Sequence, residues 1–232
     1  MILLVPCHLT VIAKQTTSEA LFSEICAQHG YAVTNIPRST SQKTADLRIV
    51  TPYGEIIAEI KELAPNQEDK AQIQNLKLNG SCEIGGVVGH RARGMIKDAA
   101  KQIESHIHEN KPAVIVLYDN IHEDGGSLQS PFGHLSMEHI DAAMYGFWTV
   151  YLSGAADSNG GERSLRCDKR CHVSAVVVMG YCAPGSLIVY HNFFASRPLS
   201  PKAFAGEMSV HLMKKNDPHQ TRSPCQWTRY QQ

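Results

Sequence analysis

The stretch TADLRIVTPYGEIIAEIKEL, residues 44–63, holds two apolar runs on either side of a turn. Each run is rich in the branched side chains that strands favour, and the proline and glycine of segment 52–54 favour a turn. We therefore expect strands at 45–50 and 55–63 that pair as a hairpin. Charged side chains lie among the apolar ones, and three of them bear on function.

Side chains alternate across a strand, so Glu59 and Lys61 share one face of the second strand. Asp46 opens the first strand, and the hairpin brings its carboxylate toward that of Glu59. Two carboxylates repel each other unless a positive charge lies between them, and a hard divalent cation such as Mg²⁺ meets this need. The alternative is structural: Glu59 and Lys61 form an ordinary exposed pair worth less than about 1 kcal/mol.

Helices and further strands surround the hairpin. Leu21, Phe22 and Ile25 give an apolar stripe to a helix that Thr17 or Ser18 caps and that runs to Gly30. The remaining expected elements are a strand at 31–36, a short helix at 68–76, a helix at 93–109, a buried strand at 113–118, a helix at 137–145, a strand at 147–152, a loop at 153–170, a hairpin of strands at 172–181 and 187–191, and a last helix at 200–215.

Composition limits the broad class. The chain has 232 residues, is 43% hydrophobic and has a formal net charge of zero. This length suits one domain, over residues 1–232, and the order of the expected helices and strands favours an α/β fold with a mixed central sheet. We expect residues 119–215 to extend this fold and residues 216–232 to form a flexible tail. Because the net charge is zero, any surface that binds nucleic acid must be local.

Cysteine content and the amino-terminal sequence bear on location. Seven cysteines are an odd number, and the start MILLVPCHLTVIAK lacks a basic segment and a clear cleavage site. No run approaches the roughly 20 apolar residues of a membrane span. We expect a cytoplasmic protein with free thiols and no membrane partner.

The order of helix, three strands, helix and strand, with Asp46 opening the second strand and Glu59-Ile60-Lys61 inside the third, resembles the core of the PD-(D/E)XK nuclease superfamily. SEALFSEICAQHGYAV, followed by ADLRIV and IIAEIKE, is most similar to archaeal Holliday-junction resolvases and restriction-endonuclease-like domains. The resemblance covers about residues 17–118. It implies a restriction-endonuclease-like αβββαβ core, extended here by a C-terminal helix, a strand and a β-hairpin.

The resemblance assigns roles to individual residues. It implies catalysis by Glu19, Asp46, Glu59 and Lys61, with Mg²⁺ or Mn²⁺ bound by the three carboxylates. Glu24 is the rival of Glu19 for the helix position. The residue before Asp46 is alanine where the fullest form of the motif has proline. The resemblance implies that such a site hydrolyses phosphodiester bonds, with DNA as the preferred substrate. It also implies a homodimer, because resolvases of this type act as homodimers.

A basic ridge follows the second helix at four-residue spacing, formed by Arg93, Lys97 and Lys101, with Gln102 beside it. The resemblance implies that this helix approaches the nucleic-acid backbone, where cations position a duplex without reading its sequence. A solvated helix face explains the same pattern equally well.

Two further groups of residues carry weaker indications. The segment CDKRCH at 167–172 has zinc-ligand residue types, but the second half of a paired zinc motif is absent, which favours free thiols. Histidines pair at His106 with His108 and at His134 with His139, without a nucleophile motif nearby. The sequence thus predicts a metal-dependent DNA nuclease, and the alternative is a catalytically inactive nuclease-fold binding or regulatory module.

Overall fold

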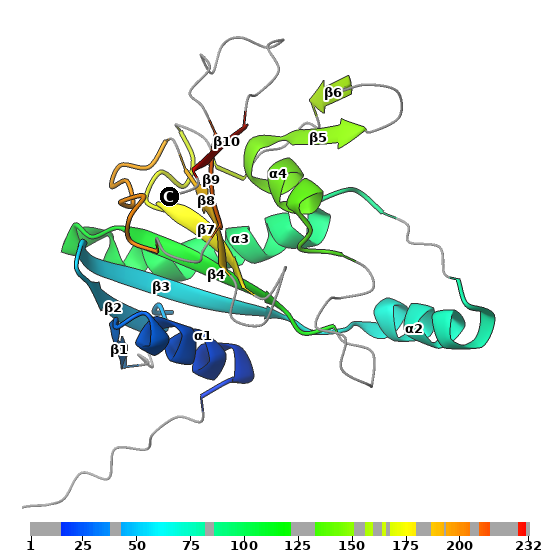
Figure 1. Cartoon of the computed structure of the whole chain (residues 1–232), viewed down its shortest axis with the longest axis horizontal. Coiled ribbons are helices and arrows are strands. Elements are labelled where there is room, and N and C mark those ends of the chain that lie inside the picture. Colours follow the sequence, from blue (N-terminus) through cyan, green and yellow to red (C-terminus); the bar gives the residue numbers. More distant parts are fainter. Residues whose placement is uncertain are drawn as a thin grey trace, which may run out of the picture.

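The chain forms an α/β structure around one large mixed sheet with helices on both faces (Figure 1). This confirms the predicted α/β class and the mixed central sheet. The computed structural model describes residues 15–37, 43–81, 86–121, 133–150, 156–159, 164–165, 168–179, 187–192, 194–204, 209–213 and 227–230.

The large sheet has the strand order β1-β2-β3-β4-β7-β8-β9-β10. The first three strands are antiparallel neighbours, β4 adds parallel to β3, and β7 adds parallel to β4 before β8 reverses direction. Its strands are β1 (Ala32–Asn35), β2 (Leu47–Thr51), β3 (Gly54–Leu63), β4 (Ala113–Asp119), β7 (Ala175–Met179), β8 (Leu187–His191), β9 (Ser209–Met213) and β10 (Trp227–Tyr230). The predicted hairpins of β2 with β3 and of β7 with β8 are confirmed.

The helical elements are α1 (Thr17–Gln28), α2 (Gln67–Asn79), α3 (His90–Ile103), the 3₁₀ helix η1 (Glu104–Glu109) and α4 (Met137–Tyr145). A small second sheet pairs β5 (Phe147–Val150) with β6 (Ala156–Asn159). Strand β6 lies inside the segment 153–170 that we expected to be a loop. The described helices include none that is long and apolar enough to cross a membrane.

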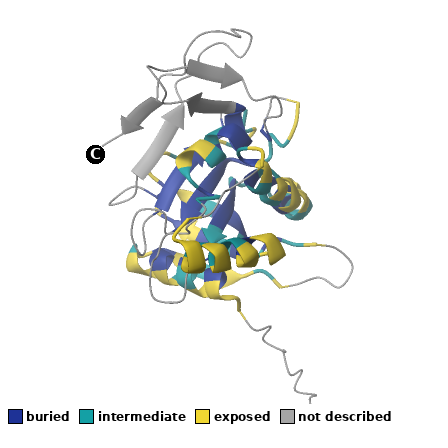
Figure 2. Cartoon of the chain, turned by 90° about the vertical axis from the view of Figure 1, so that its right-hand side faces the viewer, coloured by how far each residue is buried: buried dark blue, intermediate teal, exposed yellow. Residues whose placement is uncertain are grey.

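Two apolar layers hold the helices against the sheet, and alternation along β3 divides them. Ile56 and Ile60 pack with α1 in one cluster, whereas Ile57 and Leu63 pack with α3 and α4 in the other. Burial therefore concentrates in the strands between the helical layers (Figure 2). Glu59 and Lys61 lie two and four residues from Ile57, and side chains at this spacing share one face of a strand. They therefore lie on the α3 face.

The predicted C-terminal helix at 200–215 is wrong. Residues 201–204 form turns, and Ser209–Met213 form β9, which pairs parallel to β8. The sequence SVHLM alternates in the way that a strand requires, and the edge of β8 offers unpaired backbone groups that a helix would leave open. Part of the tail is also ordered as a strand, because β10 pairs with β9.

Three helices differ from expectation in their bounds. Thr16, rather than Thr17 or Ser18, caps α1, and its side chain accepts a hydrogen bond from the Glu19 N–H group. The helix expected at 93–109 begins earlier, at His90, and changes to a 3₁₀ helix after Ile103. Helix α2 is longer than expected and projects away from the sheet (Figure 1).

Candidate active site

The hairpin brings Asp46 to the middle of β3. The Asp46 N–H group donates to the Ala58 carbonyl at 3.1 Å, and its Oδ2 atom accepts from the Ile60 N–H group at 2.9 Å. The side chain therefore extends the β2–β3 ladder by one bond beyond the last paired residue. This fixes the Asp46 carboxylate beside residue 59, as the sequence predicted.

Glu59 and Lys61 share a face and form an ion pair on it. The Lys61 Nζ atom lies 2.7 Å from Glu59 Oε1, and the Glu59 side chain is fully buried, whereas that of Lys61 is 26% exposed. The pair therefore connects a buried carboxylate to solvent through an ammonium group. The predicted shared face is confirmed, but the pair is not the ordinary exposed one of the structural alternative.

Glu59 has an unusual electrostatic environment. Burial, and next the Asp46 carboxylate, raise the pKa of Glu59 to about 8, against the opposing effect of Lys61. Apart from its ion pair with Lys61, neither carboxylate oxygen of Glu59 accepts a hydrogen bond from the described residues. A buried polar group in this state costs free energy, which a bound cation would recover.

Gln102 joins the site from the last turn of α3. Its Oε1 atom accepts from Lys61 Nζ at 2.7 Å, and its Nε2 atom donates to the Thr44 carbonyl at 3.4 Å. Its side chain thus orients the lysine and contacts the segment that leads into Asp46. The predicted contact of Gln102 with nucleic acid stays a prediction.

Glu19 lies in the first turn of α1, on the other face of the sheet. Its Oε2 atom accepts from the Thr16 N–H group at 2.9 Å, which completes a capping box. The neighbouring Ser18 N–H group donates to Glu62 at 3.3 Å, so α1 begins near the end of β3. The contacts described for Glu19 thus stabilise its helix, and its part in metal binding stays a prediction.

The predicted basic ridge divides into two parts. The Arg93 guanidinium donates to the carbonyl groups of Ala142 and Val88, at 3.2 and 2.8 Å, and so ties α3 to α4 and the preceding loop. Lys97 is exposed, and Lys101 forms an exposed pair with Asp98. The two lysines are thus exposed, whereas the guanidinium of the partly exposed Arg93 contacts backbone carbonyl groups. The predicted phosphate contacts of all three stay predictions.

The donor set of the site suits a hard cation held in part by other ligands. No group of three or more His, Cys, Asp or Glu side chains that could hold a metal ion occurs among the described residues. Asp46 and Glu59 supply two carboxylates, and Mg²⁺ commonly uses only one or two of these together with water and substrate phosphate. The pair therefore fits Mg²⁺ or Mn²⁺ bound in the presence of substrate.

A second polar cluster, which the sequence did not predict, joins α2 to α3. Asp69 Oδ2 pairs with the Arg91 guanidinium at 2.6 Å, and Asp69 Oδ1 lies 3.2 Å from His134 Nε2. A cavity of about 340 Å³ adjoins this cluster. The sequence signal for Asp69 is the Asn66-x-x-Asp69 capping pattern, which indicates a helix start and explains the position of Asp69 without any ligand.

No protein-family model, no curated protein and no solved structure matches this chain. The resemblance to PD-(D/E)XK nucleases therefore stays a prediction from the sequence motif.

Proposed function

We propose that the protein is a metal-dependent nuclease with a restriction-endonuclease-like core, which hydrolyses phosphodiester bonds in DNA. The observation that carries the proposal is that the buried Glu59 has the Asp46 carboxylate close enough to raise its pKa and pairs with a single ammonium group, that of Lys61. When Glu59 is ionised, two carboxylates with one lysine leave one negative charge without compensation. A divalent cation and an anionic phosphate complete this arrangement.

Each residue has a separate task in the proposed reaction. Asp46 and Glu59 would hold Mg²⁺ or Mn²⁺, which when bound polarises a phosphoryl oxygen and lowers the pKa of a water molecule. The Lys61 ammonium stabilises the negative charge that develops at phosphorus. Gln102 keeps the ammonium directed at the site through its 2.7 Å hydrogen bond. Glu19 is proposed as a third ligand, which requires its carboxylate to leave the capping box.

DNA fits the exposed lysines of α3. Lys97 and Lys101 lie one helical turn apart, on the same helix as Gln102, so they can contact the phosphate backbone next to the site. The zero net charge of the chain limits long-range attraction, so backbone binding depends on these local charges. A homodimer would present a second site to a branched duplex, and we propose this only by resemblance.

The alternative function is a binding or regulatory module without chemistry. One observation favours it: the contacts described for Glu19 serve the start of its own helix, so a three-carboxylate site is not assembled among the described residues. In that case the protein would bind DNA without cleaving it. An inactive module could also bind a metal ion at Asp46 and Glu59. DNA cleavage therefore distinguishes the nuclease from the inactive module better than metal binding does.

Incubation of the purified protein with supercoiled plasmid, branched DNA and single strands tests the proposal. We expect cleavage with Mg²⁺ or Mn²⁺ and none with chelator. Glu19→Gln tests the third ligand, and Glu24→Gln, on an exposed position of the same helix, is its matched control. Binding without cleavage of every substrate, in either metal, would favour the alternative module.

A further inference from the structure

The Ala45 N–H group is a buried donor immediately before the candidate ligand Asp46. Ala45 is 1% exposed, and the pairing of β2 with β3 begins only at Leu47. A buried N–H group outside a ladder needs a partner from elsewhere. The partner here is His106 of η1, whose Nε2 atom accepts from the Ala45 N–H group at 3.3 Å.

This contact determines the tautomer of His106. Because Nε2 accepts a hydrogen bond from an N–H group, it carries no proton, and the ring proton must be on Nδ1. The Nδ1 atom lies 2.7 Å from Glu109 Oε1, so it donates to that carboxylate. His106 therefore acts as a relay with its two nitrogens in different roles, and its side chain is only 10% exposed.

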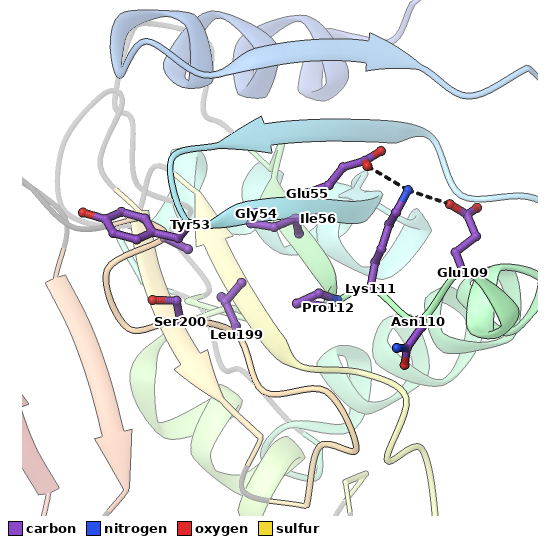
Figure 3. Close-up of a pocket in the computed structure, with 11 residues that line it drawn as sticks. Tyr53, Gly54, Glu55, Ile56, Glu109, Asn110, Lys111, Pro112, Leu199 and Ser200 are labelled. Atoms are coloured by element: carbon purple, nitrogen blue, oxygen red, sulfur yellow. Dashed lines mark hydrogen bonds and ion pairs between the residues drawn. The ribbon is translucent and has the colours of Figure 1, made fainter.

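Glu109 is in turn fixed as an anion. Its Oε2 atom lies 2.7 Å from the Arg48 guanidinium and 3.1 Å from Lys111 Nζ. Figure 3 shows Lys111 directed between Glu55 and Glu109. Arg48, against the opposing effect of burial, and then His106 and Lys111 lower the pKa of Glu109 to about 2. The carboxylate that orients His106 thus stays charged throughout the neutral range.

We propose that His106 is a positioning residue for Asp46, acting through its hydrogen bond to the Ala45 N–H group. The part of the proposal that concerns metal affinity rests on the proposed function, since it takes Asp46 as a metal ligand. Gln102 acts in parallel at the Thr44 carbonyl. Residues 102 and 106 lie four apart, so consecutive turns of one helical segment hold consecutive residues of the segment that enters β2.

The position of this contact explains its proposed effect. Asp46 Oδ2 reaches the Ile60 N–H group by a single hydrogen bond of 2.9 Å. Movement of Ala45 would displace the adjoining Cα atom of Asp46, and the carboxylate would lose that bond and its place beside Glu59. The hydrogen bond from Ala45 to His106 opposes such movement.

Two substitutions separate the two nitrogens of His106. In His106→Gln, the Oε1 atom reaches the position of Nε2 and can accept from Ala45, while the contact with Glu109 is lost. In His106→Asn, the Nδ2 atom occupies the position of Nδ1 and can donate to Glu109, while Ala45 loses its acceptor. His108→Asn, two residues away on an exposed position, is the control.

Amide hydrogen exchange by NMR on the metal-free protein gives the first measurement, and Mn²⁺ titration by calorimetry gives the second. We expect His106→Asn to reduce protection of the Ala45 and Ile60 amides at least tenfold and Mn²⁺ affinity by about 10- to 100-fold. His106→Gln should stay within about threefold of wild type in both, because it keeps the acceptor.

Equal protection in wild type and His106→Asn would overturn the proposal. Equal losses in His106→Gln and His106→Asn would also overturn it, since they would assign the effect to the Glu109 contact. If wild type binds no Mn²⁺, the proposed function fails, and amide exchange still decides whether His106 positions Asp46.

Discussion

Two charged clusters lie four residues apart on the same face of β3, and they differ in charge balance. Around Glu55, two carboxylates meet two cations, because Glu55 and Glu109 pair with Arg48 and Lys111. Around Glu59, the Asp46 carboxylate and one ammonium group, that of Lys61, act on the same side chain. The charges of the first cluster balance within the protein, whereas the second lacks one positive charge when Glu59 is ionised.

The two glutamates respond to these surroundings in opposite directions. The pKa of Glu55 is lowered, first by Lys111 and then by Arg48. The pKa of Glu59 is raised to about 8, first by burial and then by Asp46. An ion pair on a strand is therefore no evidence of function by itself. A buried carboxylate with a raised pKa and an incomplete set of partners is a candidate functional group.

The largest expected effect follows from removing a carboxylate of the incomplete cluster. Asp46→Ala or Glu59→Ala should abolish both Mn²⁺ binding and DNA cleavage, because each removes a carboxylate ligand of the proposed site. Calorimetric titration and single-turnover cleavage measure this, with circular dichroism to verify folding. Normal Mn²⁺ binding by folded Asp46→Ala would contradict the assignment of this cluster as a metal site.

A smaller effect should follow from removing the lysine of the same cluster. Lys61→Ala should keep most of the metal affinity but lose about 10²- to 10³-fold in the rate of cleavage, because one preorganised electrostatic contact with the transition state is removed. Single-turnover rates at saturating Mn²⁺ measure this, and Lys70→Ala on the exposed α2 is the control. Cleavage at the wild-type rate would leave Lys61 with a structural role only.

Glu59 should make the metal-free protein less stable as the pH rises. Because the folded-state pKa of Glu59 exceeds the value of about 4.5 expected for an unfolded chain, the stability it contributes is present below pH 4.5 and is lost as pH rises toward 8. Glu59→Gln removes this loss. The free energy of unfolding of Glu59→Gln, relative to that of wild type, should therefore be about 2–4 kcal/mol more favourable at pH 8.5 than at pH 5. Urea unfolding at both pH values measures the difference, and a pH-independent difference would contradict it.

The smallest effect is expected in the complete cluster. Glu55 is partly exposed, so Glu55→Gln should cost only about 0.5–1 kcal/mol of unfolding free energy near pH 7. The cost should disappear as the pH falls below the range in which Glu55 titrates, since its folded-state pKa is lowered. Mn²⁺ affinity should be unchanged. A loss of Mn²⁺ affinity would show that the two clusters are coupled.

Local sequence patterns were sufficient for the hairpin and its faces. Strand alternation placed Glu59 and Lys61 on one side, and the turn at 52–54 brought Asp46 alongside. The capping pattern from Thr16 to Glu19 was also readable, and it would have corrected the predicted start of α1. These features depend on neighbours within a few residues or across one tight turn.

Long-range contacts and the C-terminal strands were not readable in the same way. The contact of Gln102 with Lys61 joins residues 41 positions apart and depends on the rotation of α3 against the sheet. The contact of His106 with Ala45 has the same origin. Strand β9 forms because β8 offers an edge, so local helix signals at 200–215 gave way to sheet pairing.

Proton release on metal binding tests the charge deficit around Glu59 most directly. Mn²⁺ titration of wild type at pH 7, in two buffers of different ionisation enthalpy, counts the protons released per bound ion. Because Glu59 has a pKa of about 8 and must be ionised to bind, we predict release of about one proton at pH 7 and a nearly tenfold rise in affinity per pH unit below about pH 7. Binding without proton release, or no binding between pH 7 and 9, would contradict the account.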